Sequence, residues 1–284
     1  MENKVLTFLK RHNISLKDKT ILVGVSGGPD SMALLHFLNQ LKNKWCFQLI
    51  AISVDHQLRG KESALDIEYV KEMCSMWDIP FVAVKVDVKE YQEQHKVSTQ
   101  VAAREVRYEA FREQMRRYNG DYLALGHHGD DQVETLLMAL SRSTNLTSLT
   151  GIPVMRSFAT GNIIRPFLAV TKEEIEHYCE THHIEPRTDH TNLDTYYMRN
   201  YFRQMIVPQI KERHPNVHIT MQQLSESLQE DERYIQTEAK KAFDQAVTFD
   251  KNQKVARLEI NFLKDLSVSL QRRVYRLTLD YLYD

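Results

Sequence analysis

Cysteine is scarce in this chain, and its few copies lie far apart. The three cysteines are Cys46, Cys74 and Cys179 in a chain of 284 residues, and no C-x-x-C pair occurs. This spacing disfavours a disulfide framework, a zinc site and an iron–sulfur cluster. We therefore expect free, buried thiols in a reducing compartment.

Long hydrophobic runs are also missing. No apolar segment reaches the roughly 20 residues that a membrane-spanning helix needs. The opening residues 1–5 lack the apolar core of a signal peptide. We expect a cytoplasmic protein that does not bind a membrane. Hydrophobic residues still make up 42% of the chain, which is enough for a sizeable core.

Neither sign of charge is in excess. The chain carries 37 basic and 38 acidic residues, for a formal net charge of −1. Nucleic-acid-binding proteins often have an overall basic balance. Its absence makes such a partner less expected but does not exclude one, because a local cluster of basic residues can serve.

The segment from Thr20 to Met32 has the pattern of an anion-binding turn. An apolar run over residues 21–25 breaks at Ser26-Gly27-Gly28-Pro29 and continues as an amphipathic helix. Glycine lets the backbone approach a ligand closely, and a helix N-terminus offers unpaired N–H groups to an anion. The segment is not a common P-loop, because Asp30 and Ser31 stand where that motif has its lysine.

Apolar, strand-like runs alternate with helical patterns along most of the chain. Further strands are expected at residues 47–54, 81–86, 122–126 and 162–167. The alternation predicts an α/β fold, a mostly parallel Rossmann-like sheet with helices on both faces. Ligands of such sheets bind at the carboxyl ends of the strands. Three motifs directly follow expected strands, so we expect them to meet in one crevice: Ser26–Ser31, Asp55–Arg59 and His127–Glu134.

The composition changes near residue 213. A long polar helix is expected over residues 218–246, a weak hairpin over 247–262 and an amphipathic helix over 269–282. We expect a catalytic domain over residues 1–212 and a smaller, mainly helical second domain over 213–284. The sequence leaves open whether this second domain is truncated.

Several strings, in this order, resemble the tRNA(Ile)-lysidine synthetase family of the N-type ATP pyrophosphatase (PP-loop) superfamily. The resemblance covers roughly residues 18–210, and many members carry a further C-terminal tRNA-binding domain. It implies that residues 1–212 form a PP-loop domain. The strings are SGGPDS at 26–31, VDHQLR at 54–59, AREVRY at 103–108, GHHGDDQVET at 126–135, Arg165-Pro166, DHTN at 189–192 and YMRNYFR at 197–203.

The resemblance implies a ligase that joins free L-lysine to C2 of the wobble cytidine of tRNA(Ile) with a CAU anticodon. In the first step, O2 of the cytidine attacks the α-phosphate of ATP, which gives an adenylated tRNA and pyrophosphate. In the second step, the ε-amine of lysine attacks C2 and AMP leaves. The tRNA thereby changes from methionine to isoleucine specificity. ATP, Mg²⁺, lysine and this tRNA are the implied partners.

The resemblance assigns the glycine-rich turn and its neighbours to ATP. Asp30 either contacts Mg²⁺ or only caps the helix. The residues after the second strand either bind the nucleotide or form a solvated turn. The expected ATP-binding residues are Ser26, Gly27, Gly28, Pro29, Asp30, Ser31, Asp55, His56, Arg59 and His127.

Two pairs of arginines are candidates for charge stabilisation and RNA binding. Arg104 is expected to be catalytic, with its guanidinium near the α-phosphate or the tRNA backbone, and Arg107 to bind tRNA. The alternative for both is a salt-bridged surface helix. Arg199 and Arg203, four residues apart, suit contacts with tRNA phosphates.

Two carboxylates three residues apart complete the expected site. Asp131 and Glu134 share one helix face. They are expected to act in catalysis by binding the cationic lysine, by holding Mg²⁺ (through Asp131) or by deprotonating the amine. The alternative is that they are ordinary acids at a helix N-terminus, where the dipole favours them.

Two other functions remain open. One is another PP-loop tRNA-modifying enzyme such as a thiolase, although sulfur-transferring relatives often need the paired cysteines that this chain lacks. The other is a nucleotide-binding protein without catalysis, which would explain the glycine-rich turn but not the carboxylates and arginines. The sequence also leaves open whether the chain forms a homodimer.

Overall fold

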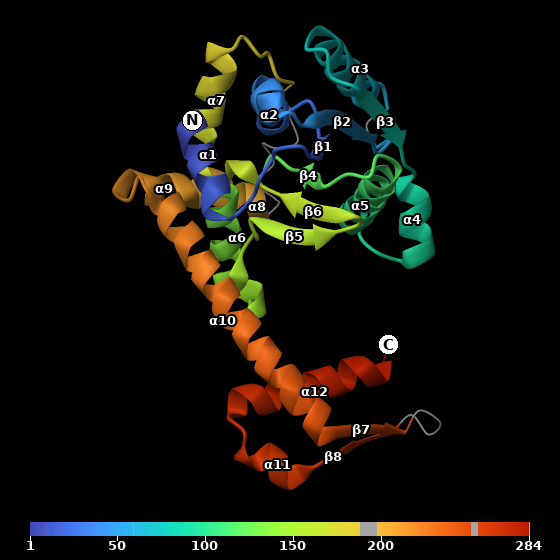
Figure 1. The fold of residues 1–284 in the computed structure, drawn as a ribbon, viewed down its shortest axis with the longest axis vertical. Helices are drawn as coiled ribbons and strands as arrows, with labels where there is room; N and C mark the ends of the chain where they lie inside the picture. The colour runs from blue at the N-terminus through green and yellow to red at the C-terminus, as the bar shows by residue number, and fades with distance from the viewer. Residues whose placement is uncertain (59, 188–197, 251–254, 284) are drawn as a thin grey trace. The chain divides into compact units, whose positions relative to one another are not determined.

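The chain is organised around a six-stranded sheet with the strand order β3-β2-β1-β4-β6-β5 (Figure 1). A computed structural model describes residues 1–58, 60–187, 198–250 and 255–283. Five strands are parallel, and β5 pairs antiparallel with β6 at one edge. The strands are β1 (Thr20–Gly24), β2 (Gln48–Asp55), β3 (Phe81–Lys85), β4 (Tyr122–Ala124), β5 (Met155–Phe158) and β6 (Gly161–Ile164).

The four strands expected first along the sequence are confirmed to within a few residues. The fifth expected strand, residues 162–167, is too long, because Pro166 lacks an N–H and begins the short 3₁₀ turn η2 (Pro166–Ala169). The expected strands also omitted β5, whose burial pattern is mostly exposed. An edge strand of this kind lacks the continuous apolar run that marks a buried strand.

Helices cover both faces of the sheet, as the alternation predicted. On β1, Ile21 and Val23 point into the core cluster that includes α2, whereas Leu22 points into the cluster that includes Phe111 of α5. This two-residue alternation places α2 and α5 on opposite faces (Figure 1). The helices of this part are α1 (Glu2–Arg11), α2 (Pro29–Trp45), α3 (Lys61–Met76), α4 (Val88–His95), α5 (Thr99–Arg117), α6 (Gly129–Arg142), α7 (Lys172–Thr181), α8 (Met198–Tyr201), the π-helical η4 (Phe202–Ile206) and α9 (Val207–Arg213).

The strand order places a ligand site before any side chain is considered. From β1 the chain moves outward to β2 and β3, then returns to add β4 on the other side of β1. A crevice opens at such a switch point, outside the carboxyl ends of the neighbouring strands. The three expected motifs follow β1, β2 and β4, so they border this crevice.

The described residues form two compact units. The first is Met1–Arg142 with Gly151–Gln223, and the second is Ser143–Thr150 with Leu224–Asp284. The chain passes from one to the other inside α10 (Val217–Ala246), and the division near residue 212 stays a prediction. The second unit contains the rest of α10, the turn η1 (Thr147–Thr150), the hairpin β7 (Val247–Asp250) and β8 (Val255–Leu258), α11 (Ile260–Asp265) and α12 (Val268–Tyr283).

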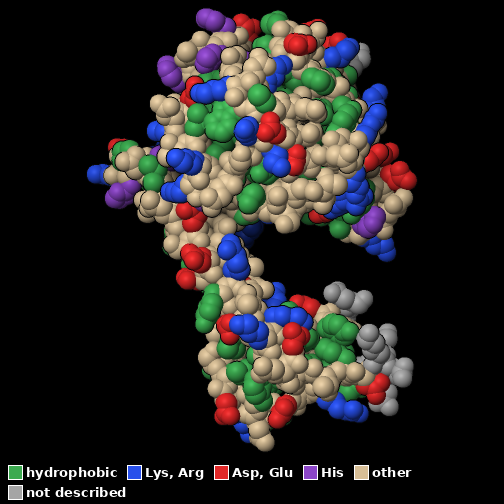
Figure 2. All heavy atoms as spheres, viewed as in Figure 1, with side chains coloured by type: hydrophobic (Ala, Val, Ile, Leu, Met, Phe, Trp, Pro, Cys, Tyr) green, Lys and Arg blue, Asp and Glu red, His purple; other side chains and the backbone are tan. Residues whose placement is uncertain are grey.

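The surface carries both signs of charge (Figure 2), and two of the three cysteines are buried as expected. Figure 2 shows basic and acidic side chains interspersed over the visible face of the first unit. Cys74 and Cys179 are buried free thiols as expected, whereas the prediction was wrong for Cys46. Cys46 is exposed at the C-terminus of α2, where its backbone is left-handed with φ of 53°.

Among the described helices, none is both long and apolar enough to span a membrane.

Candidate active site

A cavity of about 300 Å³ lies at the carboxyl ends of β1, β2 and β4. We call it the main cavity. All three expected motifs contribute to its lining, as the fold predicted. The glycine-rich turn supplies Ser26, Gly28, Asp30 and Ser31. The other two motifs supply Asp55, His56, His127 and Asp131.

The glycine-rich turn is held open as a loop by its own hydroxyls. Gly27 has φ of +87°, a conformation that a side chain would strain. Gly28 caps α2, and Pro29 fills the first helical position. The Ser31 hydroxyl donates to the carbonyl of Gly28 at 3.0 Å and accepts from the N–H of Ser26 at 3.1 Å. The loop therefore presents the N-terminus of a 17-residue helix to the main cavity.

The charge of Asp30 is compensated from within the protein. Lys172, at the start of α7, donates from Nζ to Asp30 Oδ1 at 2.7 Å. No group of three or more acidic, histidine or cysteine side chains is arranged as a preformed metal site among the described residues. Mg²⁺ commonly binds through one or two carboxylates while substrate phosphates and water complete its shell. Asp30 fits that role, because it borders the main cavity beside the glycine-rich turn.

The end of β2 forms a tight turn beside the loop. Asp55 Oδ1 accepts the N–H of Gln57 at 2.9 Å, and both Asp55 and His56 line the main cavity. Arg59, expected to bind ATP, lies outside the described residues. The expected DHTN string at 189–192 and Tyr197 also lie outside them.

Asp131 and Glu134 meet the two later arginines in one cluster. Arg203 donates from Nε to Glu134 Oε1 at 2.7 Å and from Nη2 to Asp131 Oδ1 at 2.9 Å. Arg199 donates from Nε to Glu134 Oε2 at 3.0 Å. We call these four side chains the ionic quartet. Asp131 borders the main cavity, whereas Glu134 is 1% exposed and lies one helical turn deeper.

The quartet sets the charge state of this end of the cavity. Burial alone would raise the pKa of Asp131, but the neighbouring histidines and the guanidiniums of Arg199 and Arg203 lower it well below its usual range. Burial lowers the pKa of His127 to about 3, with nearby guanidiniums acting in the same direction. At neutral pH the cavity therefore offers an ionised Asp131 and an uncharged His127.

Helix α5 brings the two arginines expected in the site to different places. Arg107 lines the main cavity. Arg104 instead borders an adjoining cavity of about 310 Å³, the side cavity, which shares His56, Ser63 and Arg107 with the main one. The Arg104 guanidinium stacks on the ring of Tyr108, 4.8 Å from its centre.

Sequence reasoning assigned no role to two arginines near this helix. Arg165 is the first residue after the carboxyl end of β6, and Arg156 lies on β5. The position of Arg165 was a usable signal, because site residues follow parallel strands. Arg165 was noted only as part of a string of the resemblance, because the expected strand ran past it. Lys172, the partner of Asp30, carries no comparable signal in the sequence.

The chain is similar to known proteins over its whole length. Residues 1–210 match the model of the family described as PP-loop domain. The tRNA(Ile)-lysidine synthase of Oceanobacillus iheyensis is 45% identical over all 284 residues, and that of Bacillus subtilis is 45% identical over 282. The matches cover 61% and 59% of those two relatives, so the chain spans about three fifths of their length.

A solved structure shares the fold at low sequence identity. The U34-tRNA thiolase NcsA from Methanococcus maripaludis matches with a TM-score of 0.66 and 20% identity. The match covers 81% of this chain and 77% of that one. This likeness supports the fold assignment alone.

Proposed function

Since the chain belongs to the PP-loop domain family, we propose that it binds ATP and ligates lysine to C2 of the wobble cytidine of tRNA(Ile) with a CAU anticodon. The observation that carries the proposal is the convergence in one cavity of an anion-binding turn and an ionised carboxylate. The identity to lysidine synthases along the whole chain supports the choice of substrates.

The proposed reaction has two displacements. O2 of the cytidine attacks the α-phosphate of ATP, and the bond to pyrophosphate breaks. The ε-amine of lysine then attacks C2 of the adenylated base, and AMP leaves with the former O2. The first step needs positive charge around the α-phosphate, and the second needs a place for a cationic substrate.

The glycine-rich turn holds the pyrophosphate part of ATP in this proposal. Gly28, Asp30 and Ser31 at the N-terminus of α2 line the main cavity, and the Ser26 and Ser31 hydroxyls lie 3.3 Å apart. Asp30 is the residue that would hold Mg²⁺, which supplies charge neutralisation on the phosphates when bound. His127, being uncharged, accepts or donates a hydrogen bond without adding charge to the site.

Lysine binds at Asp131 in this proposal. Asp131 is the member of the acidic pair that borders the cavity, and it is kept ionised there. An ionised carboxylate attracts the ammonium group of lysine. Glu134 is a positioning residue, because it has no access to the cavity and holds Arg199 and Arg203 against Asp131.

The geometry favours exchanging the roles expected for the two α5 arginines. Arg107 lines the cavity that contains the glycine-rich turn, so we assign it to the charge that develops at the α-phosphate. Arg104 lies toward the side cavity and is better placed for RNA. The tRNA contacts expected of Arg199 and Arg203 stay predictions, and these side chains retain 45% and 38% exposure.

A sulfur-transferring reaction is the second candidate and is less well supported. Cys46, Cys74 and Cys179 lie on α2, α3 and α7 or at their ends, and none lines the main cavity. A non-catalytic nucleotide sensor would not need the ionic quartet. We also place the protein in the cytoplasm, where its substrates are found, while the homodimer stays open.

Lysine transfer tests the proposed function directly. The chain is incubated with ATP, Mg²⁺, radiolabelled lysine and a tRNA(Ile) transcript with a CAU anticodon. We expect label in the RNA together with release of AMP and pyrophosphate. A transcript with uridine in place of the wobble cytidine is the matched control and should remain unlabelled. Absence of label in the CAU transcript, from protein that still binds ATP, would contradict the proposal.

A further inference from the structure

Four guanidiniums converge on one tyrosine at the edge of the proposed site. Arg104, Arg107 and Arg156 have their guanidinium carbons 4.8, 5.9 and 5.3 Å from the centre of the Tyr108 ring. Arg165 is close enough to act on the same hydroxyl. We call these five side chains the arginine cluster. They come from α5, β5 and the end of β6, segments far apart in the sequence.

The cluster has no internal anion. Among the described residues, no carboxylate forms a salt bridge with any of its four arginines. Arg165 is only 3% exposed, and its Nε has no hydrogen-bond partner, while its Nη1 donates to the carbonyl of Pro153 at 2.6 Å. In the ionic quartet, by contrast, each carboxylate forms a salt bridge with an arginine.

The positive charges of the arginine cluster are not balanced by a nearby negative charge among the described residues. Burial and the like charges of Arg156 and Arg104 lower the pKa of Arg165 to about 10, against the opposing effect of Tyr108. Burial and Arg104 likewise lower the pKa of Arg107. A buried charge without a partner is costly, so such a cluster gains when an anion enters.

The Tyr108 ring positions two guanidiniums without using all of their N–H donors. Tyr108 is buried, and the guanidinium carbons of Arg104 and Arg156 lie over its ring. Arg104 Nη2 donates to the Tyr108 hydroxyl at 3.5 Å. A guanidinium has five N–H donors, so those not directed at Tyr108 can donate to phosphate oxygens. Both arginines are exposed at the surface, so a polymer can reach them without entering the main cavity.

We propose that the arginine cluster binds one phosphodiester of the RNA substrate, beside the nucleotide that reacts in the main cavity. This inference rests on the proposed function for the identity of the RNA. The pyrophosphate of ATP already has a place at the glycine-rich turn, which Arg104 does not border. Arg107 lines both cavities, so it connects the phosphodiester site to the reaction site.

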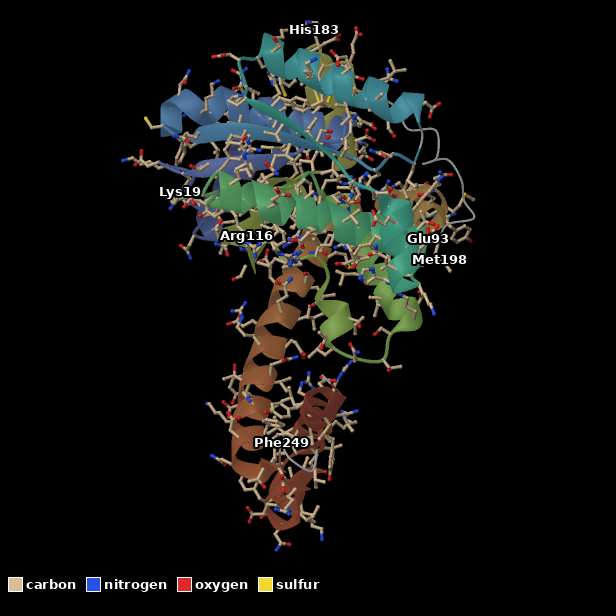
Figure 3. The ribbon with its side chains drawn as sticks, turned by 90° about the vertical axis from the view of Figure 1, so that its right-hand side faces the viewer. Lys19, Glu93, Arg116, His183, Met198 and Phe249 are labelled. Atoms are coloured by element: carbon tan, nitrogen blue, oxygen red, sulfur yellow. The ribbon has the colours of Figure 1, made fainter. Side chains whose placement is uncertain are left out.

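RNA binding without catalysis provides the test. The probe is a fluorescein-labelled anticodon stem-loop of tRNA(Ile) with a CAU anticodon, titrated with the chain in the absence of ATP. The variants are Arg156→Met, Arg104→Met and the double variant. Arg116→Met is the matched control, because Arg116 is an exposed arginine of α5 at the end away from α4 and makes no contact with Tyr108 (Figure 3).

A single shared phosphate gives a specific pattern. We expect Arg156→Met and Arg104→Met each to weaken RNA binding about tenfold, and Arg116→Met less than twofold. The slope of log affinity against log salt should fall by about one in the double variant, because one phosphate contact is lost. The two losses should be coupled rather than additive. Thermal unfolding of each variant checks that the exposed substitutions leave the fold intact.

Three results would overturn the inference. An equal loss in Arg116→Met would indicate a general basic surface. Additive losses with a salt slope that falls by two would indicate two separate phosphates. Weakened ATP binding with unchanged RNA binding would show that the anion belongs to the nucleotide. Failure of lysine transfer with this binding pattern intact would remove the proposed reaction and leave the phosphodiester site standing.

Discussion

Removing the buried negative charge of Glu134 should destabilise the first unit measurably. Glu134→Gln keeps the shape of the side chain but leaves Arg199 and Arg203 with Asp131 as their only carboxylate in the ionic quartet. Glu134 accepts three guanidinium hydrogen bonds, at 2.7, 3.0 and 3.1 Å. The change therefore tests whether the ionic quartet holds α8 and η4 against α6.

The size of the effect follows from burial. A hydrogen bond to a charged group contributes about 1.5–3 kcal/mol, and glutamine retains part of it. The two arginines are 45% and 38% exposed, so water replaces some of what they lose. We expect the free energy of unfolding to fall by about 2 kcal/mol, which corresponds to about 4–8 °C in melting temperature for a unit of this size.

Tryptophan fluorescence is the suitable assay, because both tryptophans, Trp45 and Trp77, lie in the first unit. Urea unfolding followed by this signal reports that unit without the second one. Glu113→Gln is the control, since Glu113 is an exposed acid of α5 with no ion pair among the described residues, and it should change stability by less than about 0.5 kcal/mol. Equal shifts in the two variants would refute the reasoning.

Acidification tests the other carboxylate of the ionic quartet, Asp131. The pKa of Asp131 is lowered in the folded protein, so its contribution is present above the ordinary carboxylate range near pH 4 and is lost as the pH falls further. Asp131→Asn should therefore destabilise the first unit at pH 7, and by a smaller amount at pH 3, where part of the contribution of the carboxylate has been lost. A constant difference at both values would contradict the assignment of the shift to ionic partners.

Three further changes probe the loop and the core. Ser31→Ala removes the hydroxyl that links Gly28 to Ser26, and it should weaken ATP binding about three- to tenfold, as measured by calorimetry. Ser75→Ala, at an exposed serine, is the control and should leave the ATP affinity unchanged. Equal affinities of the two variants would reject the role of the Ser31 hydroxyl. Gly27→Ala should weaken ATP binding more than Gly28→Ala, because only Gly27 has a positive φ; the reverse order would argue against loop strain. Burial, aided by His182, lowers the pKa of His36 to about 4, so the free energy of unfolding falls as the pH drops from 6.5 to 4. In His36→Gln, the urea midpoint should change less with pH over this range. An unchanged pH dependence would show that another group causes it.

Local patterns were sufficient for the loop and the sheet. The apolar run before Ser26 and the amphipathic pattern after Pro29 indicate strand, turn and helix within about 20 residues. The order of strands and helices then predicts a parallel sheet and a crevice at its carboxyl edge. These inferences depend on neighbours along the chain, and the structure confirms them.

Partners of charged side chains could not be predicted in the same way. The four-residue spacing of Arg199 and Arg203 suggested a phosphate-binding face, yet in the structure both contact carboxylates more than 60 positions earlier. Lys172 and Asp30 are 142 positions apart. No local signal marks such pairs, because any exposed arginine or lysine can pair with any acid that folding brings near.

The sequence by itself determined that an anion-binding turn and an acidic pair follow strands of one α/β sheet, because the periods of strand and helix and the turn chemistry of glycine and proline are local. Only the tertiary structure decided which charges compensate one another. It paired the acids with Arg199, Arg203 and Lys172, and it left the arginines around Tyr108 without an internal anion. That difference arises from distances across the fold, which no local pattern in the sequence reports.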